Sequence, residues 1–315
     1  MNTTEHNQTP EAEATSRGPN LGNPQGGKDL HQQITDRIIE AMETARGTGR
    51  RLWGSQPSLP LNLATGKPYT GINTLILWAA GLKHAYASPY WLTYQQATQQ
   101  GGQVRKGEHG ELCVFYKPWE IEEATDTGES ETRKGAVLKS FRVFNLDQIN
   151  GIEAPAKAER PAFVGLQEAD LILAACPVPV MIGNGETQAY YHLSSDTIHL
   201  PAPERFTSPE AFYSVALHEM THSTGHSSRL NRTFGKRFGD EAYAMEELVA
   251  EMGSAFLNAD LGIINATLPD HADYLASWIK VLKSDKRAIL TAAAQAAKAQ
   301  AFIKALLPAG ARGAD

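Results

Sequence analysis

The sequence His218-Glu219-Met220-Thr221-His222 constrains the fold of this 315-residue chain more than any other feature. Residues four positions apart lie on one face of a helix, so the two imidazoles can bind one metal ion. Glu219 can then take a proton from a metal-bound water. The motif predicts a catalytic metal site, with His218 and His222 as ligands and Glu219 as the catalytic base. The alternative is two surface histidines on an amphipathic helix.

Signals on both sides of the motif predict that it lies in a helix. Thr207 and Glu210 have the spacing of a capping box, and Pro209 would lie in the first turn. Gly225 follows the second histidine and predicts the C-terminal end of the helix. The expected helix therefore includes both histidines.

A zinc site needs a third protein ligand. Glu247 and Glu251 share a face of the next predicted helix, and we expect Glu247 to be the ligand and Glu251 to orient a histidine. The alternatives are the reverse assignment and two solvated surface acids. His226 is another candidate ligand, which otherwise lines the cleft or is a plain loop histidine. The longer pattern HExxHxxGxxH fails, because Ser228 stands at its third histidine.

The motif and the downstream sequence Glu247-Leu248-Val249-Ala250-Glu251 together resemble zincin metallopeptidases whose third ligand is a glutamate. This resemblance implies a small twisted sheet, an active-site helix and a following helix. It also implies that Glu219 deprotonates the water and later protonates the leaving amine. Strands within residues 189–201 would face an extended peptide. Three residues are equal candidates for stabilising the oxyanion: Tyr243, His226 and Arg229.

The net charge of −6 taken alone argues against nucleic-acid binding, but the charge is unevenly distributed. Residues 46–110 contain seven Lys or Arg and one acid, whereas residues 120–131 contain six acids. Aromatic residues are interleaved with the cations, and exposed rings beside cations are typical of single-stranded nucleic-acid binding. The alternative is that most of these rings form a core. The aromatic residues are Trp53, Trp78, Trp91, Trp119, Tyr69, Tyr86, Tyr90 and Tyr94; the cations are Arg50, Arg51, Lys67, Lys83, Arg105 and Lys106.

Composition shifts along the chain predict two α+β domains. The expected division is a disordered tail (1–28), a small α+β domain (29–150), a Pro/Ala-rich linker (151–163), a zincin-like domain (164–307) and a tail (308–315). Hydrophobic periodicity predicts helices at 29–47, 75–80, 91–100, 166–175, 241–259, 270–283 and 286–306. We expect Asn73 to cap the second helix, a hairpin between strands near 104 and 112–116, a loop at 120–135 and a strand at 139–145.

Other sequence features exclude several classes of protein. Cys113 and Cys176 are too few and too far apart for a disulfide scaffold or a cysteine-rich zinc finger. There is no 18-residue apolar run, and the N-terminal residues have no apolar core of a signal peptide. We therefore expect a cytoplasmic monomer with no membrane partner.

The order of segments across residues 29–307 resembles antirestriction proteins of the ArdC type, with only the tail and the acidic segment 120–135 outside the match. The segments are PYTGINTLIL, SPYWLTYQQATQQGGQVRKGEHGELCVFYK, FRVFNLDQING, FYSVALHEMTHSTGHSSRLNR, AYAMEELVAEMGSAFL and YLASWIKVLKSDKRAILTAAAQAAKAQAFI. The resemblance implies a domain that binds single-stranded DNA, a metal-binding domain, and protection of incoming conjugative DNA from restriction. The N-terminal module is shared with conjugative primases of the TraC type. Candidate DNA contacts are Tyr69, Asn73, Trp91, Thr93, Arg105 and Lys106; Asn73 could equally cap a helix, and Trp91 could lie in the core.

Two other functions fit the sequence. One is a metallopeptidase whose N-terminal domain only recruits its peptide substrate. The other is a DNA-processing accessory related to conjugative plasmid primases. In each case we expect one divalent metal: a donor set of two histidines and a glutamate favours Zn2+, and Mn2+ or Co2+ can occupy similar sites.

Overall fold

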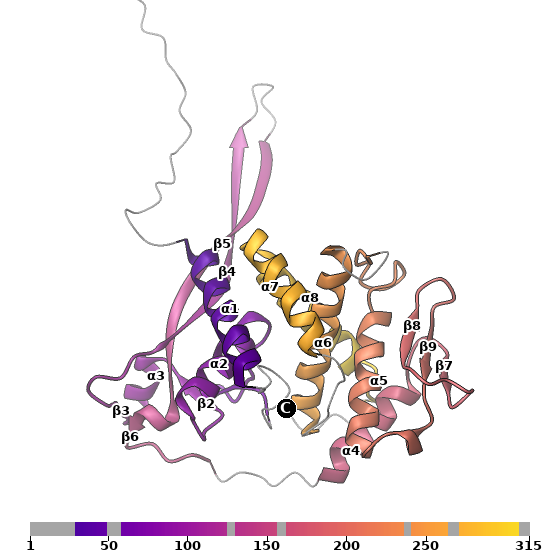
Figure 1. Cartoon of the computed structure of the whole chain (residues 1–315). Coiled ribbons are helices and arrows are strands. Elements are labelled where there is room, and N and C mark those ends of the chain that lie inside the picture. The colour runs from indigo at the N-terminus through magenta and orange to yellow at the C-terminus, as the bar shows by residue number, and fades with distance from the viewer. Residues whose placement is uncertain are drawn as a thin grey trace, which may run out of the picture.

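The computed structural model describes residues 29–48, 58–124, 130–155, 162–235, 241–263 and 271–308. The predicted tail 1–28, the segment with Arg50, Arg51 and Trp53, and the last seven residues lie outside this part of the chain. The fold is α+β, as expected. A small mixed sheet with helices forms the N-terminal half, and a helical group beside a three-stranded sheet forms the C-terminal half (Figure 1).

The N-terminal half is built around the sheet β1-β2-β5-β4. Its strands are β1 (Leu61–Asn62), β2 (Tyr90–Leu92), β5 (Ser130–Asn145) and β4 (Glu111–Ala124). The helices are α1 (Leu30–Thr48), α2 (Ile72–His84), α3 (Tyr94–Gln99) and the 3-10 turn η1 (Leu146–Gln148). Strands β4 and β5 form a long hairpin that projects beyond the helices (Figure 1). The prediction of a helix at 29–47 is confirmed by α1.

Strand pairing differs from the sequence prediction in two places. β3 (Gln103–Val104) pairs with β6 (Ile149–Asn150) rather than with the strand after the glycine turn. The expected loop at 120–135 instead belongs largely to β4 and β5, whose register sets Glu120 opposite Lys134. The same register sets Glu122 opposite Thr132 and Glu123 opposite Glu131, so the antiparallel ladder continues unbroken from residue 111 to residue 124, which the acidic composition of this segment did not indicate.

Two helix starts were also predicted wrongly. α2 begins after Gly71 rather than after Asn73. The expected helix at 91–100 divides into β2 and α3, because Trp91 and Leu92 pair with β5 and are buried. Tertiary burial here overrides the helical periodicity, and α3 begins only after Thr93.

The C-terminal half follows the predicted order of elements. The helices are α4 (Ala162–Ala174), α5 (Pro209–Ser223), α6 (Glu241–Leu261), α7 (His271–Ser284) and α8 (Ala288–Lys304), with a 3-10 turn η2 (Pro203–Arg205). The sheet has the order β7-β9-β8, from β7 (Val180–Ile182), β9 (Thr197–Leu200) and β8 (Tyr190–His192). β9 runs parallel to β7 and antiparallel to β8, so β8 is an edge strand. Ser208, rather than Thr207, caps α5, and its Oγ accepts a hydrogen bond from the backbone N–H of Ala211.

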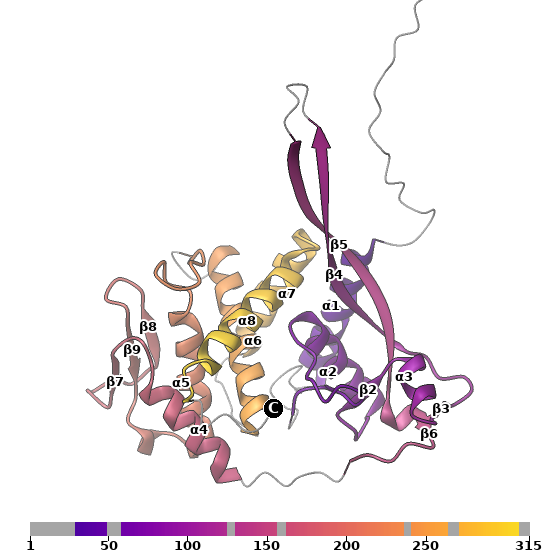
Figure 2. The ribbon, with the colours of Figure 1, turned by 180° about the vertical axis from the view of Figure 1, so that it is seen from behind.

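A single buried cluster, which we call the shared core, joins the two halves. Helices α1 and α2 contribute to it together with α6, α7 and α8, and these elements lie side by side in both views (Figures 1 and 2). Its largest members include Ile34, Ile38, Met42, Leu75, Trp78, Leu248, Met252, Phe256, Trp278 and Ile289. The predicted domain boundaries at 150 and 163 stay a prediction, but the two halves do not pack independently. Within the described residues, no helix is both long and apolar enough to cross a membrane.

Candidate metal centre

Helices α5 and α6 pack closely enough to bring their functional side chains together. A Cβ atom at Gly253 would lie 2.6 Å from the side chain of Thr221, so this position in α6 requires glycine. Farther along the contact, Asn258 Nδ2 donates to Ser214 Oγ at 2.7 Å, and Ser254 Oγ donates to the carbonyl of Ser214. These contacts fix the register in which α6 presents its carboxylates to α5.

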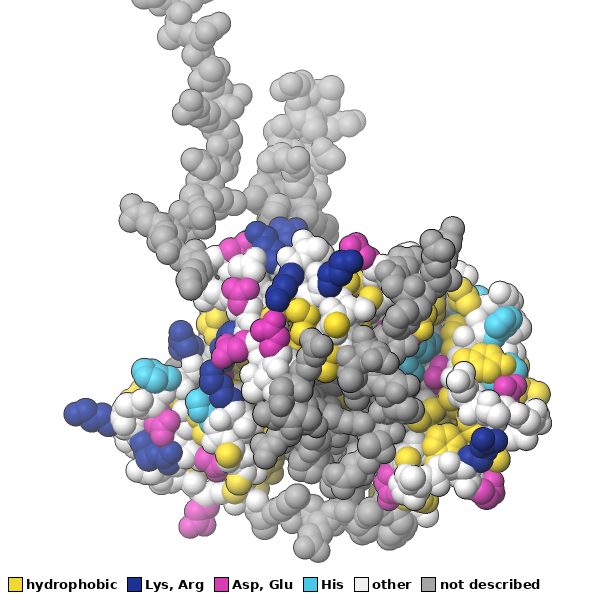
Figure 3. All heavy atoms as spheres, viewed as in Figure 1, with side chains coloured by type: hydrophobic (Ala, Val, Ile, Leu, Met, Phe, Trp, Pro, Cys, Tyr) yellow, Lys and Arg dark blue, Asp and Glu magenta, His cyan; other side chains and the backbone are white. Residues whose placement is uncertain are grey.

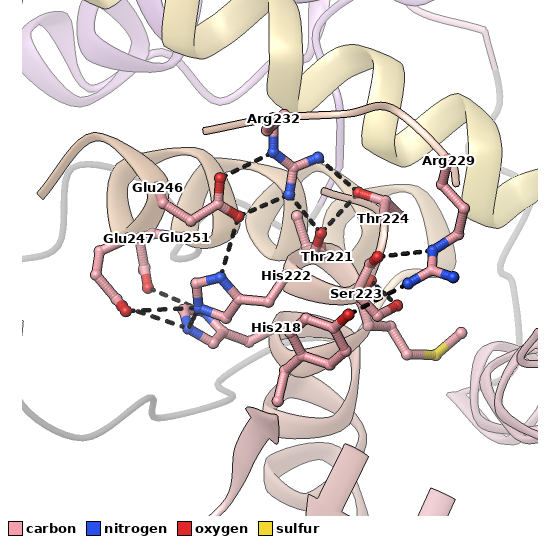
Figure 4. Close-up of polar contacts among 12 residues, drawn as sticks. His218, Thr221, His222, Ser223, Thr224, Arg229, Arg232, Glu246, Glu247 and Glu251 are labelled. Atoms are coloured by element: carbon pink, nitrogen blue, oxygen red, sulfur yellow. Dashed lines mark hydrogen bonds and ion pairs between the residues drawn. The ribbon is translucent and has the colours of Figure 1, made fainter. Parts of the chain in front are cut away.

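Three predicted ligands meet at this helix pair. The Nε2 atoms of His218 and His222 lie 3.2 Å apart. The carboxylate of Glu247 lies 3.7 Å from His218 Nε2 and 3.6 Å from His222 Nε2. The three ligand atoms lie within 4.8 Å of one another, and Figure 4 shows them converging on one point between the helices. The structure therefore brings together the three side chains that the sequence indicated as ligands, and their role as ligands stays a prediction.

Each histidine has a second carboxylate at its other ring nitrogen. Glu251 lies 3.9 Å from Nδ1 of His218, on the side where we expected an orienting residue. Glu246 accepts a hydrogen bond from Nδ1 of His222 at 3.1 Å. The hydrogen bond at His222 sets the tautomer of that ring and leaves its Nε2 available as a ligand. Nδ1 of His218 is buried without a hydrogen-bond partner in the described part of the chain, with Glu251 as the carboxylate that faces it.

Arg232 completes this arrangement, although no motif or spacing in the sequence points to Arg232 or Glu246. The Arg232 guanidinium donates to both oxygens of Glu246 and to the carbonyl of Thr221 near the end of α5 (Figure 4). Glu246 adjoins Glu247 in sequence but no pattern set it apart as a partner of His222. Arg232 lies in the loop after α5. A loop has no regular residue spacing from which the direction of a side chain can be predicted.

The carboxylates around His218 strongly favour the protonated, positively charged form of its imidazole. Burial lowers the pKa of His218, but the hydrogen bond to Glu247 and the charges of Glu219 and Glu251 outweigh it and raise the pKa to about 9. Burial has the opposite effect on a carboxyl group and raises the pKa of Glu247. The hydrogen bond from His218 and the charges of His218 and His222 outweigh this effect and lower the pKa of Glu247 to about 2. The pKa of Glu246 is lowered despite its burial, because Arg232 and His222 hold its charged form. The carboxylates therefore remain ionised around two imidazoles.

The residues present fit a divalent metal ion. Two Nε2 atoms that face each other at 3.2 Å need a proton or a cation between them, because two lone pairs repel. Two imidazoles and one carboxylate are the donor set of many catalytic metal sites. The fit rests on this geometry and on the carboxylates behind both rings.

A cavity of about 740 Å³ opens beside the cluster. Glu219, only 7% exposed, lines it together with His218. Tyr243 also lines it and donates a hydrogen bond to Glu247. The edge strand β8 forms part of the wall through Tyr190 and Tyr191. Of the two strands within residues 189–201, β8 is the edge strand and borders the cavity, whereas β9 is the central strand of its sheet; the expected contact with an extended peptide stays a prediction.

The other two oxyanion candidates lie elsewhere. His226 Nδ1 lies 2.8 Å from Ser228 Oγ, and the residue belongs neither to the ligand cluster nor to the cavity wall. Arg229 donates to both carboxylate oxygens of Asp196 and to the carbonyl of Ser223. Arg229 thus ties the β8–β9 turn to the end of α5. Of the three candidates, only Tyr243 lines the cavity.

Four of the six predicted DNA contacts have structural roles. Trp91 is 2% exposed and Tyr69 9% exposed, so neither ring can stack on a base in this structure. Burial raises the pKa of Tyr69 to about 12, and its hydroxyl accepts a hydrogen bond from Asn62. Thr93 Oγ1 accepts from the backbone N–H of Gln96 and caps α3.

Asn73 is neither a cap nor a surface contact. Its side-chain amide donates to the carbonyl of Val114 at 2.8 Å and accepts from the N–H of Val114 at 2.9 Å. Since β4 is the edge of its sheet, this amide satisfies backbone groups that no neighbouring strand pairs. Arg105 and Lys106, by contrast, are exposed in the turn after β3.

Family models match both halves of the chain. A model described as the N-terminal domain of anti-restriction factor ArdC matches residues 28–144. A model described as a zincin-like metallopeptidase matches residues 167–295. The second match includes α5 and α6 and therefore the whole ligand cluster.

Similar proteins extend over most of the chain. The uncharacterized protein y4eC of Sinorhizobium fredii is 38% identical over 87% of this chain and 91% of its own length. The DNA primase TraC of Escherichia coli is 38% identical over 88% of this chain, but only 27% of its own length is matched.

Crystal structures of the antirestriction ArdC protein from the R388 plasmid share the fold. The metal-free structure has a TM-score of 0.72 and 38% identity over 89% of this chain and 98% of its own. The Mn(II)-bound structure has a TM-score of 0.73 and 36% identity over 91% of this chain and 100% of its own. Fold, domain order and sequence agree along nearly the whole length, and the chain therefore belongs to the ArdC family of antirestriction proteins.

Proposed function

We propose that this chain protects incoming plasmid DNA from restriction by binding it as a single strand, and that it holds one divalent metal between α5 and α6. The observation that carries the proposal is the presence, in one ArdC-family chain, of the ArdC-type N-terminal half and the His218–His222–Glu247 cluster. We expect the protein to act as a cytoplasmic monomer.

His218, His222 and Glu247 would hold the metal. The match to a Mn(II)-bound relative supports a divalent ion, and the donor set suits Zn2+, Mn2+ or Co2+. When bound in such a site, a divalent ion supplies Lewis-acid polarisation of a carbonyl or phosphoryl oxygen.

The chain's own residues have distinct tasks in this proposal. Glu219 lies on the cavity wall beside His218, where its carboxylate can accept a proton from a group in the cavity and return it to a leaving group. Tyr243 fixes Glu247 by a hydrogen bond and presents its ring to the same cavity. Glu246 and Arg232 hold the ring of His222.

Single-stranded DNA is the partner that the N-terminal half favours. Residues 46–110 have a net excess of cations, and the end of the molecule formed by α3, β3 and β6 carries Lys/Arg side chains beside acidic ones (Figure 3). Arg105 and Lys106 are exposed there, whereas the remaining candidate contacts lie in the core or hold secondary structure. Cations on one face track phosphates without reading sequence, as protection of any entering strand requires.

Peptide hydrolysis is the second candidate function. The edge strand β8 borders the cavity that contains Glu219, and an extended peptide can add to such an edge by backbone hydrogen bonds. A DNA-processing role related to TraC is weaker, since the match includes only 27% of that primase.

A restriction-protection assay in cells distinguishes these functions. We expect Lys106→Ala combined with Arg105→Ala to reduce protection of a transferred plasmid, because the exposed cations are lost. If Glu219→Ala retains full protection, peptide hydrolysis is not needed for antirestriction. The matched control is Lys298→Ala, an exposed cation on α8 in the other half. Full protection by the double variant, expressed at the level of the parent protein, would contradict the proposed DNA contact.

A further inference from the structure

A second cavity lies at the end of the N-terminal half, away from the metal cluster. Its volume is about 570 Å³, within the range of about 300–1,000 Å³ typical of small-ligand sites. It is formed where α3, β3, β6 and the end of β5 meet, at the opposite end of the molecule from α5 (Figures 1 and 2). Its lining includes Tyr94, Gln103, Lys106, Glu108, Phe144 and Asn150.

Tyr94 is a large aromatic residue that the fold leaves exposed. It is the first residue of α3 and is held in place by the capping box between Thr93 and Gln96. Its side chain is 53% exposed, and among the described residues its hydroxyl has no hydrogen-bond partner. Its ring crosses that of Phe144 at 68°, with centroids 6.3 Å apart, so the two rings are not stacked face to face. A rigid exposed ring of this kind is suited to stack on a planar ligand.

The turn after β3 supplies the positive charge of the groove. The N–H of Glu108 donates to the carbonyl of Arg105 at 3.2 Å, and Gly107 adopts a φ of 90°, which favours glycine. Glu108 accepts hydrogen bonds from Nε and Nη2 of Arg105, at 3.2 and 2.7 Å. It also accepts one from Gln148, which lowers the pKa of the Glu108 carboxyl. The anchored turn presents Lys106, which has no ion-pair partner in the described part of the chain.

We propose that this groove binds one nucleotide of single-stranded DNA, with its base stacked on Tyr94 and its phosphate paired with Lys106. The inference rests on the proposed DNA-binding function and assigns a position to it. Gln103 and Asn150 lie opposite each other in the β3–β6 ladder and line the same groove. Amide side chains both donate and accept, so they can contact the edge of any base.

The chemistry of the groove favours a nucleotide over a phosphorylated peptide. Phosphopeptide sites use clusters of free arginines that bind phosphate bidentately. Here the one arginine is bound to Glu108, and a single free lysine remains beside an exposed ring. A base inside a duplex cannot reach Tyr94 without leaving its stack, so the groove selects single strands.

An oligonucleotide pair tests the stacking contact in the full-length protein. We would measure the Kd, by fluorescence anisotropy, for a labelled oligothymidine and for an oligomer of equal length whose sugars lack bases. Wild type should bind the oligothymidine more tightly by about 5- to 160-fold per stacked base. Tyr94→Ala should reduce that ratio, and Tyr94→Phe should retain it. Lys106→Ala should weaken binding of both oligomers alike.

The same measurements distinguish a failure of the stacking site from a failure of the proposed DNA-binding function. Tyr116 is 55% exposed on the hairpin, so Tyr116→Ala removes an equally exposed ring from the same half. If Tyr94→Ala leaves the ratio unchanged while wild type binds both oligomers, the stacking site is wrong and DNA binding stands. If wild type binds neither oligomer at low salt, the DNA-binding function fails and the subsite with it. Because Tyr94 is exposed, its substitution should preserve the far-ultraviolet circular dichroism spectrum.

Discussion

The Arg232 guanidinium binds the Glu246 carboxylate through two hydrogen bonds, 2.9 Å from Nε and 2.7 Å from Nη2. Because Glu246 also accepts from His222, Arg232 is linked through Glu246 to one of the three residues that we propose as metal ligands. A bidentate pair restrains orientation as well as charge, and lysine cannot reproduce that geometry.

We therefore expect Arg232→Ala to weaken metal binding by about 10- to 100-fold, the usual loss when a residue that orients a histidine is removed. Arg232→Lys should give an intermediate loss. Competition against a fluorescent chelator would measure the Kd, and Arg205→Ala, an exposed arginine in η2, is the control. An Arg232→Ala protein that is folded and binds metal like the parent would show that the link to His222 has no effect.

The stability of the metal-free protein should depend on pH through His218. Its pKa is raised from 6.5 to about 9, so the folded state holds this proton more tightly than the unfolded state. The resulting stabilisation is complete below about pH 6.5 and is lost as the pH rises through about 9. Glu247 acts in the opposite direction: its pKa is lowered from 4.5 to about 2, and its contribution is lost as the pH falls toward 2.

A Tm series on chelator-treated protein between pH 6 and 9.5 would measure this effect. We expect the Tm to fall across that interval, and the fall to be smaller in His218→Gln. Saturation with metal should also reduce it, since the metal replaces the proton. Identical pH profiles for the parent and His218→Gln would rule out His218 as the source.

Asn73→Ala should destabilise the protein rather than specifically weaken DNA binding. The substitution leaves the N–H and carbonyl of Val114 without partners at a partly buried edge, which costs about 1–3 kcal/mol of unfolding free energy. Urea denaturation would measure the change, with Gln95→Ala, an exposed residue of α3, as the control. A loss of DNA affinity at unchanged stability would instead restore Asn73 as a DNA contact.

Ile38→Ala should destabilise the metal centre although Ile38 lies in the N-terminal helix α1. Its side chain is fully buried in the shared core, where α6 contributes Leu248 and Met252. Removing it should cost about 2–5 kcal/mol. Because α6 also carries Glu247, metal release and loss of N-terminal structure should occur at the same temperature in a thermal melt. In Ile38→Ala, we expect both transition temperatures to fall by the same amount. A lower melting temperature for only one of the two signals would contradict cooperative unfolding through this core.

Local sequence patterns were sufficient for most helices and for the positions of the candidate ligands on one helix pair, but not for β2, for the pairing of β3 or for the strands within 120–135. The spacing of His218 and His222, and the helical register of Glu247 and Glu251, depend only on the period of an α-helix, which neighbouring structure hardly changes. The C-terminal helices follow in the same way from their apolar repeats. The two family models match the chain in the same order as the sequence segments that resemble ArdC-type proteins.

Nonlocal contacts decided the remainder. No residue pattern indicates that β3 pairs with β6, that Asn73 reaches the edge of β4, or that Arg232 binds Glu246. Composition also cannot distinguish a buried ring from an exposed one, so Trp91 and Tyr94 looked alike in sequence and differ in the fold. Spacing along a helix is set by backbone geometry and can be calculated from sequence. Which side chains meet across elements depends on how those elements pack, and only the tertiary structure determines that.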